Sequence, residues 1–167
     1  MKTLSTLVIS WAVLMGALTV GRLTPAAQES NGTLQGVWRT VEVAVPGTPA
    51  RTFRPEATLA IFHGRHYSRI EVHAEQPRPL LADQATASAD ELRAVWGPFV
   101  GEAGMFELSG NTLTMQAMVA KNPAAMRPGA PSVYTYRRHG DLLTLTQVRS
   151  AGLPSPNPVT ITLSRVE

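Results

Sequence analysis

Apolar and polar residues alternate along most of the chain, which is the pattern of β-strands with one buried face. The clearest pair of strands flanks Gly110-Asn111, a two-residue sequence suited to a tight hairpin loop. With Ser109 opposite Thr112, four apolar residues share one face of this hairpin: Phe106, Leu108, Leu113 and Met115. A shift of one residue would scatter them over both faces, so the pattern specifies the register.

A second hairpin is predicted over residues 134–145, with His139-Gly140 as its loop and Arg138 opposite Asp141. One face of it contains Tyr134, Tyr136, Leu143 and Leu145. The two aromatic residues and the two leucines make this the face that we expect to lie inside the protein.

A third hairpin is predicted over residues 59–63 and 66–73, on either side of Gly64-Arg65. Its two faces differ in character. One is apolar and contains Leu59, Ile61, Ile70 and Val72; the other is mixed and contains Phe62, Tyr67, Arg69 and Glu71. Which of these faces points inward decides whether charged groups line the interior.

Single strands at residues 36–45 and 159–165 bring the expected total to eight. One short helix is predicted over residues 88–96, because Ser88 and Glu91 have the spacing of a capping box and Gly97-Pro98 follows. Segments rich in proline and glycine are predicted to be loops: residues 46–55, 123–131 and 152–158. Eight hairpin-connected strands form either two packed sheets or a closed barrel, and a closed barrel has an interior large enough for one small ligand.

Residues 1–27 have the pattern of a secretory signal peptide, with Lys2, an uncharged apolar run over residues 4–20 and a small-residue exit. We expect a spacer at residues 28–33, a barrel domain at residues 34–167, and a periplasmic or secreted protein. If the segment is not cleaved it would anchor the protein to a membrane, because its apolar run approaches the length that spans a bilayer. No later segment is apolar enough to span one.

The composition is that of one globular domain, with 167 residues of which 44% are apolar and 16% charged. The net charge of +3 falls to +1 without Lys2 and Arg22, and lysine and arginine form no run, so a nucleic-acid partner is not expected. The chain has no cysteine, which excludes disulfides, thiolate metal sites and cysteine nucleophiles.

Gly36-Val37-Trp38 in the first strand and Arg165 in the last resemble two features of the lipocalins. The resemblance implies that Trp38 packs at the closed end of a barrel and that Arg165 covers it. The predicted faces allow this, because Arg165 shares a face with Ile161 and Leu163, and a cation–π contact between arginine and tryptophan is favourable.

Further blocks occur in order along the chain: His66-Tyr67-Ser68, Gln76-Pro77-Arg78-Pro79, Gly97-Pro98-Phe99, the hairpin at residues 106–113, Val119-Ala120-Lys121-Asn122-Pro123, and Arg165-Val166-Glu167. With these blocks, the chain resembles the secreted lipocalin-like domain family over roughly its whole mature length. The resemblance implies an all-β fold, an eight-stranded antiparallel lipocalin-like barrel with one short helix. It implies no particular reaction.

Sites for metals and for nucleophilic catalysis are not supported by the pattern. His63 and His66 would be direct partners across their turn, but His73 has the opposite parity to His66 and lies ~23 Å further along the strand. We interpret the first two as solvated histidines and expect no metal site and no cofactor. Ser68 lies in no nucleophile elbow, and phosphate-binding and dinucleotide-binding loops are absent from the sequence, so no catalytic residue is assigned.

Binding of a small apolar or amphipathic molecule in the barrel is the function that the pattern favours. The candidate ligand-binding residues are Phe106, Met115, Tyr134 and Tyr136 on inward faces, Phe62, Tyr67 and Arg69 if the mixed face turns inward, and Lys121 and Asn122 at the barrel mouth. Arg69 or Tyr136 would orient the ligand, and a guanidinium suits a carboxylate.

Two alternatives use the same residues differently. In the first, the cavity is the active site of an isomerase or cyclase in which Arg69, Glu71 and Tyr67 act. In the second, the aromatic residues and methionines fill the barrel, and the protein has a structural or interaction role.

Overall fold

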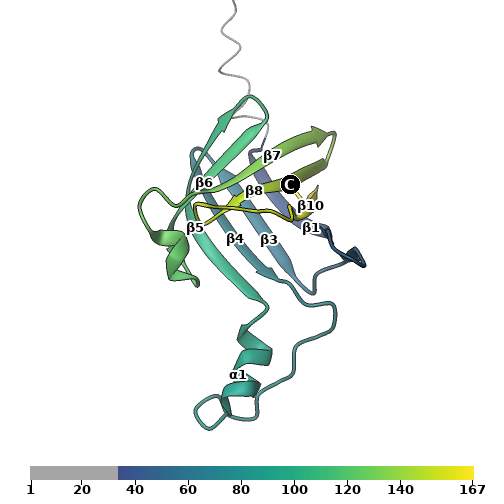
Figure 1. The fold of residues 1–167 in the computed structure, drawn as a ribbon, viewed down its shortest axis with the longest axis vertical. Coiled ribbons are helices and arrows are strands. Elements are labelled where there is room, and N and C mark those ends of the chain that lie inside the picture. The colour runs from purple at the N-terminus through teal and green to yellow at the C-terminus, as the bar shows by residue number, and fades with distance from the viewer. Residues whose placement is uncertain (1–33) are drawn as a thin grey trace, which may run out of the picture.

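The computed structural model describes residues 34–167, and eight of its strands form a closed antiparallel barrel (Figure 1). These strands are β1 (Gly36–Val45), β3 (Thr58–His63), β4 (His66–Val72), β5 (Phe99–Ser109), β6 (Thr112–Ala120), β7 (Ser132–His139), β8 (Leu142–Ser150) and β10 (Thr160–Arg165). Strand β10 pairs with both β1 and β8, and this closes the barrel. The predicted eight-stranded barrel is confirmed, while the predicted signal peptide and spacer lie outside the described residues.

Two short strands lie within segments predicted to be loops, so that prediction is wrong at these positions. They are β2 (Arg51–Phe53), which pairs with β1, and β9 (Leu153–Pro154), which pairs with β8. Each pairs with the final residues of a barrel strand, and the proline in β9 is tolerated because an edge position does not require its missing donor. The third predicted loop contains a short 3-10 helix, η1 (Pro123–Met126).

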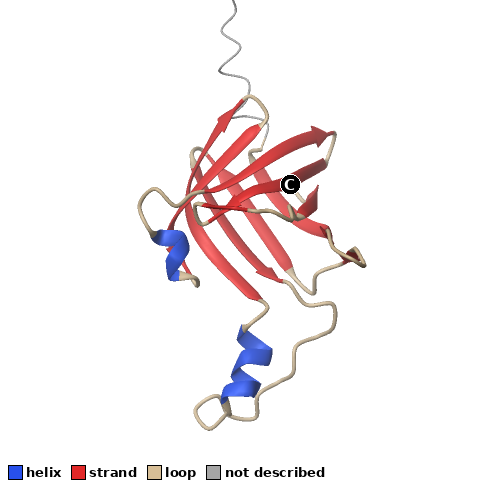
Figure 2. Cartoon of the chain, viewed as in Figure 1, coloured by secondary structure: helices blue, strands red, loops and turns tan. Residues whose placement is uncertain are grey.

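The predicted helix is present as α1 (Ala89–Trp96), and it extends beyond one end of the barrel on the long connection between β4 and β5 (Figure 2). Its capping box is formed: the Glu91 amide donates to Ser88 Oγ, and the Ser88 amide donates to the Glu91 carboxylate. The helix is tied to the barrel at its other end by Lys121. Within residues 34–167, neither helix is long and apolar enough to cross a membrane.

The hairpin turns confirm two of the three predicted loops. Gly110-Asn111 and Gly64-Arg65 are loops as predicted, but the loop between β7 and β8 is Gly140-Asp141 rather than His139-Gly140. In all three turns glycine takes the first loop position with a positive φ of 56–59°, a conformation that suits glycine far better than histidine. The correction shifts the pairing by two positions, so each side chain keeps its predicted face.

The mixed face of the β3–β4 hairpin points into the barrel. Glu71 is only 1% exposed, whereas Ile70 and Leu59 on the other face are 50% and 42% exposed. The large rings of the mixed face explain this choice, because Phe62 packs edge-on against Phe106 at 5.2 Å between ring centroids. The consequence is that charged side chains enter the barrel interior and aliphatic ones cover part of its outer wall.

One end of the barrel is filled by a continuous apolar core, which we call the closed end. Its buried residues include Leu34, Trp38, Phe62, Tyr67, Phe106, Leu113, Met115, Leu143 and Leu163. They come from strands all around the barrel, so side chains from the whole wall pack against one another in this cluster.

Trp38 seals the closed end between two guanidinium groups. Arg165 lies over its ring with 5.4 Å from Cζ to the ring centroid, and Arg138 lies at 5.7 Å. The indole nitrogen donates to the Leu34 carbonyl. Gly36 allows this arrangement, because a Cβ at that position would lie 2.7 Å from Arg165 Nη2. The spacing of glycine and tryptophan in the sequence therefore has a steric explanation.

Candidate functional site

The opposite end of the barrel contains an open cavity of about 420 Å³, which we call the barrel cavity. It lies among the final residues of β1, β4 and β8 and the first residues of β5, β7 and β10. Its apolar wall consists of small and medium side chains, among them Val43, Val45, Phe53, Val100, Val159 and Ile161. The barrel is therefore hollow at this end, and the filled-barrel alternative describes only the closed end.

Arg69 lies at the centre of the polar part of the cavity wall. Its Nη1 donates a hydrogen bond of 3.1 Å to the Tyr134 hydroxyl, its Nη2 lies 3.3 Å from Glu102 Oε1, and its Nε lies 3.7 Å from Glu71 Oε2. The side chains of Arg69 and Glu102 are 12% and 10% exposed. One buried guanidinium thus faces two buried carboxylates.

Two atoms of this cluster, Arg69 Nε and Glu102 Oε1, are buried without a hydrogen-bond partner among the described residues. The contact between Glu102 Oε1 and the guanidinium is an ion pair, and it lacks the geometry of a hydrogen bond. A buried acceptor without a donor costs about 1–3 kcal/mol. Glu102 lines the barrel cavity with a side chain that is 10% exposed, while its Oε1 is covered by protein atoms.

The charges of the cluster support one another. Burial opposes the charge of Glu71, but Arg69 and the hydrogen bond from His73 outweigh it and lower the pKa of the Glu71 carboxyl. Burial also opposes the charge of Arg69, and Tyr134 together with the two carboxylates outweighs it and raises the pKa of the guanidinium. Both pKa shifts therefore favour the charged forms of Arg69 and Glu71.

His73 connects this cluster to the mouth of the cavity. Its Nε2 lies 2.6 Å from Glu71 Oε2, and its side chain is 31% exposed on the cavity wall. Glu71 also accepts a hydrogen bond from the Thr40 hydroxyl at 3.4 Å. A carboxylate that orients an imidazole in this way is a common arrangement for proton transfer.

The structure separates the nine predicted ligand-binding residues into three groups. Arg69, Asn122 and Tyr134 line the barrel cavity, and Tyr134 also belongs to the apolar core. Phe62, Tyr67, Phe106 and Met115 belong to the core of the closed end. The remaining two predicted residues, Tyr136 and Lys121, bond to backbone carbonyls elsewhere. The Tyr136 hydroxyl donates to the Gly110 carbonyl, and the Lys121 ammonium donates to the carbonyls of Trp96, Gly97 and Phe99.

Burial of Tyr67 in that core, close to the Glu102 carboxylate, raises the pKa of its hydroxyl well above the ordinary value. The group stays protonated beside the charged cluster. Tyr67 is therefore a neutral hydroxyl in the core, and it does not line the cavity in which the enzyme alternative would act.

Sequence reasoning missed Glu102, Gln147 and the role of His73. Glu102 has the same parity in its strand as Phe106, so extending the inward face toward the start of that strand would have placed Glu102 inside. Gln147 was missed for a similar reason, since it lies in β8 beyond the residues included in the predicted hairpin, and it donates to the Tyr134 hydroxyl at 3.4 Å.

His63 and His66 face each other across the turn, as the sequence predicts. Within residues 34–167 there is no group of three histidine, aspartate or glutamate side chains able to hold a metal ion. The described part of the chain therefore offers the histidine pair no third protein ligand.

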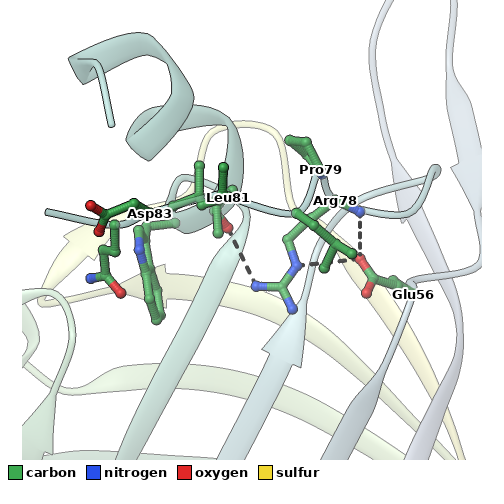
Figure 3. Close-up of a pocket in the computed structure, with 10 residues that line it drawn as sticks. Glu56, Arg78, Pro79, Leu81 and Asp83 are labelled. Carbon is green, nitrogen blue, oxygen red and sulfur yellow. Dashed lines mark hydrogen bonds and ion pairs between the residues drawn. The ribbon is translucent and has the colours of Figure 1, made fainter. Parts of the chain in front are cut away.

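A second pocket, of about 400 Å³, lies outside the barrel beside α1 (Figure 3). Its main polar groups bond to each other: Arg78 donates from its backbone amide and its Nε to Glu56 and from its Nη1 to the Val95 carbonyl, and Asp83 accepts from the Ala85 amide. The barrel cavity is the stronger candidate site, because its wall includes a buried polar atom that still needs a partner.

Comparisons of the chain with protein-family models, curated proteins and solved structures found no match.

Proposed function

We propose that this protein is an exported lipocalin-like carrier that binds a small amphipathic molecule in the barrel cavity. The observation that carries the proposal is the division of the interior into a filled end and a hollow of about 420 Å³. Ligand cavities in proteins commonly measure about 300–1,000 Å³ and combine apolar walls with a few polar groups. Export and membership of the lipocalin-like family rest on the sequence pattern of residues 1–27 and on the resemblance described above.

The two parts of the wall suit the two parts of such a molecule. Val43, Val100 and Ile161 offer apolar surface, and burying it gives roughly 25 cal/mol per Å². The cluster around Arg69 and Glu102 fixes the orientation of the polar end. Both parts come from barrel strands, so the site is rigid before a ligand arrives.

The proposal is tested with a neutral fluorescent probe, N-phenyl-1-naphthylamine, and two tryptophan variants. Val45→Trp fills the cavity from its wall, whereas Val148→Trp places the same side chain at a 43% exposed position on β8. We expect the unaltered protein and Val148→Trp to bind one probe molecule, and Val45→Trp to bind at least about tenfold more weakly. Equal binding by all three would place the probe elsewhere and contradict the proposal.

An enzyme that uses the same cavity is a second candidate, favoured by the contact between His73 and Glu71. Of the residues first expected to act, Arg69 lines the cavity, Glu71 lies behind His73, and Tyr67 belongs to the core. The test uses the molecule that copurifies with the protein from its native host. If the protein converts it and His73→Gln abolishes conversion but keeps binding, the enzyme is favoured over the carrier.

A further inference from the structure

The hydrogen bonds and charges of the cavity wall indicate which polar group a ligand would carry. Glu102 is the key residue, because its side chain is nine-tenths buried, it lines the hollow, and its Oε1 accepts no hydrogen bond. A carboxylate oxygen can only accept, so its partner must be a donor.

The balance of charge in the wall points the same way. Glu71 and Glu102 are opposed by the single guanidinium of Arg69, which leaves one negative charge in excess beside the hollow. At the mouth, Arg51 is paired with Glu75 at 3.4 Å and adds no net charge. A protonated His73 would bring the sum to zero and would not make it positive.

A ligand with a carboxylate fits this wall poorly. The guanidinium of Arg69 already contacts Tyr134 and both carboxylates, so an incoming anion would approach two like charges within a few ångströms. The expectation from sequence that Arg69 holds a ligand carboxylate does not account for Glu102, which the sequence analysis did not place inside the barrel.

We infer that the polar end of the ligand is a protonated amine that pairs with the Glu102 carboxylate, with its hydrocarbon part along Val43, Val100 and Ile161. This inference rests on the proposed function and adds the chemical class of the ligand. An ammonium group offers the Glu102 carboxylate a charged donor and cancels the excess charge at once. Hydrogen bonds between ionised partners are also about twice as strong as neutral ones.

The test compares three probes with the same alkyl chain, n-octylamine, 1-octanol and octanoate, by calorimetry near neutral pH. We expect octylamine to bind at least about tenfold more tightly than octanol, and octanoate most weakly. Glu102→Gln keeps the size of the side chain but removes its charge, so it should weaken octylamine binding about tenfold and leave octanol within about threefold.

Glu107→Gln is the matched control. Glu107 lies on the same strand, β5, but it faces outward and pairs with Arg65 at 3.0 Å. Glu107→Gln therefore has the same net charge as Glu102→Gln but an intact cavity wall. We expect it to bind octylamine as the unaltered protein does. Circular dichroism shows whether each variant is folded, and the order of the three probes on the unaltered protein decides the question even if Glu102→Gln does not fold.

The outcomes separate the two proposals. If octanoate or octanol binds as tightly as octylamine, or if a folded Glu102→Gln binds octylamine unchanged, the amine inference is overturned and the carrier proposal stands. If none of the three probes binds and N-phenyl-1-naphthylamine does not bind either, the carrier proposal itself fails.

Discussion

The two ends of the barrel are built by the same strands and differ in the side chains that point into the interior. At the closed end the inward positions are large and apolar, such as Trp38, Phe106 and Leu113, and they form a buried core. At the open end they are smaller or charged, such as Val45, Glu102 and Arg69, and they surround a hollow. Apolar packing stabilises the closed end, and ion pairs stabilise the open end. In a barrel of this kind the size of the inward side chains decides where a ligand can enter.

This comparison predicts that stability comes mainly from the closed end. Phe106→Ala should lower the free energy of unfolding by about 4 kcal/mol, because it removes a ring that is 2% exposed and packed against Phe62. The same change at Phe53, on the cavity wall, should cost less than about 1 kcal/mol. Urea unfolding measures both, and equal losses would show that the two ends do not differ in this way.

The second prediction tests whether charge stabilises the open end. Glu71→Gln should lower the free energy of unfolding by about 3 kcal/mol at pH 7, because it breaks a buried ion pair and leaves Arg69 with less compensation. The surface variant Glu107→Gln should change it by less than about 0.5 kcal/mol. A small effect at Glu71 would mean that the cluster contributes little to stability.

The effect of Glu71 should also depend on pH. Its pKa is lowered by folding, so its contribution is present above the ordinary value of 4.5 and is lost as the pH falls through the lower value of the folded state. The difference between the unaltered protein and Glu71→Gln should therefore shrink below about pH 4.5. Unfolding curves at several pH values measure it, and a constant difference would contradict this assignment.

The third and smallest prediction concerns the seal at the closed end. Gly36→Ala places a Cβ 2.5 Å from the Glu167 carbonyl and 2.7 Å from Arg165 Nη2, so it should cost about 2 kcal/mol. Gly64→Ala has a positive φ as well but open space around it, and should cost about 1 kcal/mol. Thermal unfolding of the two variants measures the difference, and equal values would mean that Arg165 moves aside freely.

Most of the fold could be predicted because alternation and turn residues are local signals. The register at Gly110-Asn111 and the capping box at Ser88 follow from a few neighbouring residues, and both are confirmed. The loop at Gly140 was placed one residue too early, because the sequence alone did not show which loop position required the positive φ. The short strands β2 and β9 pair with β1 and β8 only a few residues away, but they lie in segments rich in proline and glycine that lack an alternating pattern.

The candidate site was harder to predict because it depends on which face turns inward. On the β3–β4 hairpin the sequence left open which face points inward, and in the structure Ile70 is exposed and Glu71 is buried. The cost of burying Glu71 is offset by Arg69, its neighbour two residues away, and by His73. Both partners lie two residues from Glu71 on the same segment, but a pattern of apolar and polar residues does not show that ion pairing offsets the cost of its burial.

Strand β10 forms both of the seams that complete the barrel, one with β1 and one with β8. Without residues 160–165, the parts of β1 and β8 that pair with β10 would have unpaired backbone groups along one edge. Such edges readily pair with other chains, and contacts so distant in sequence form slowly. A copy that stops short of Thr160 would therefore be expected to aggregate. Pairing of the final strand, β10, protects the protein from such association.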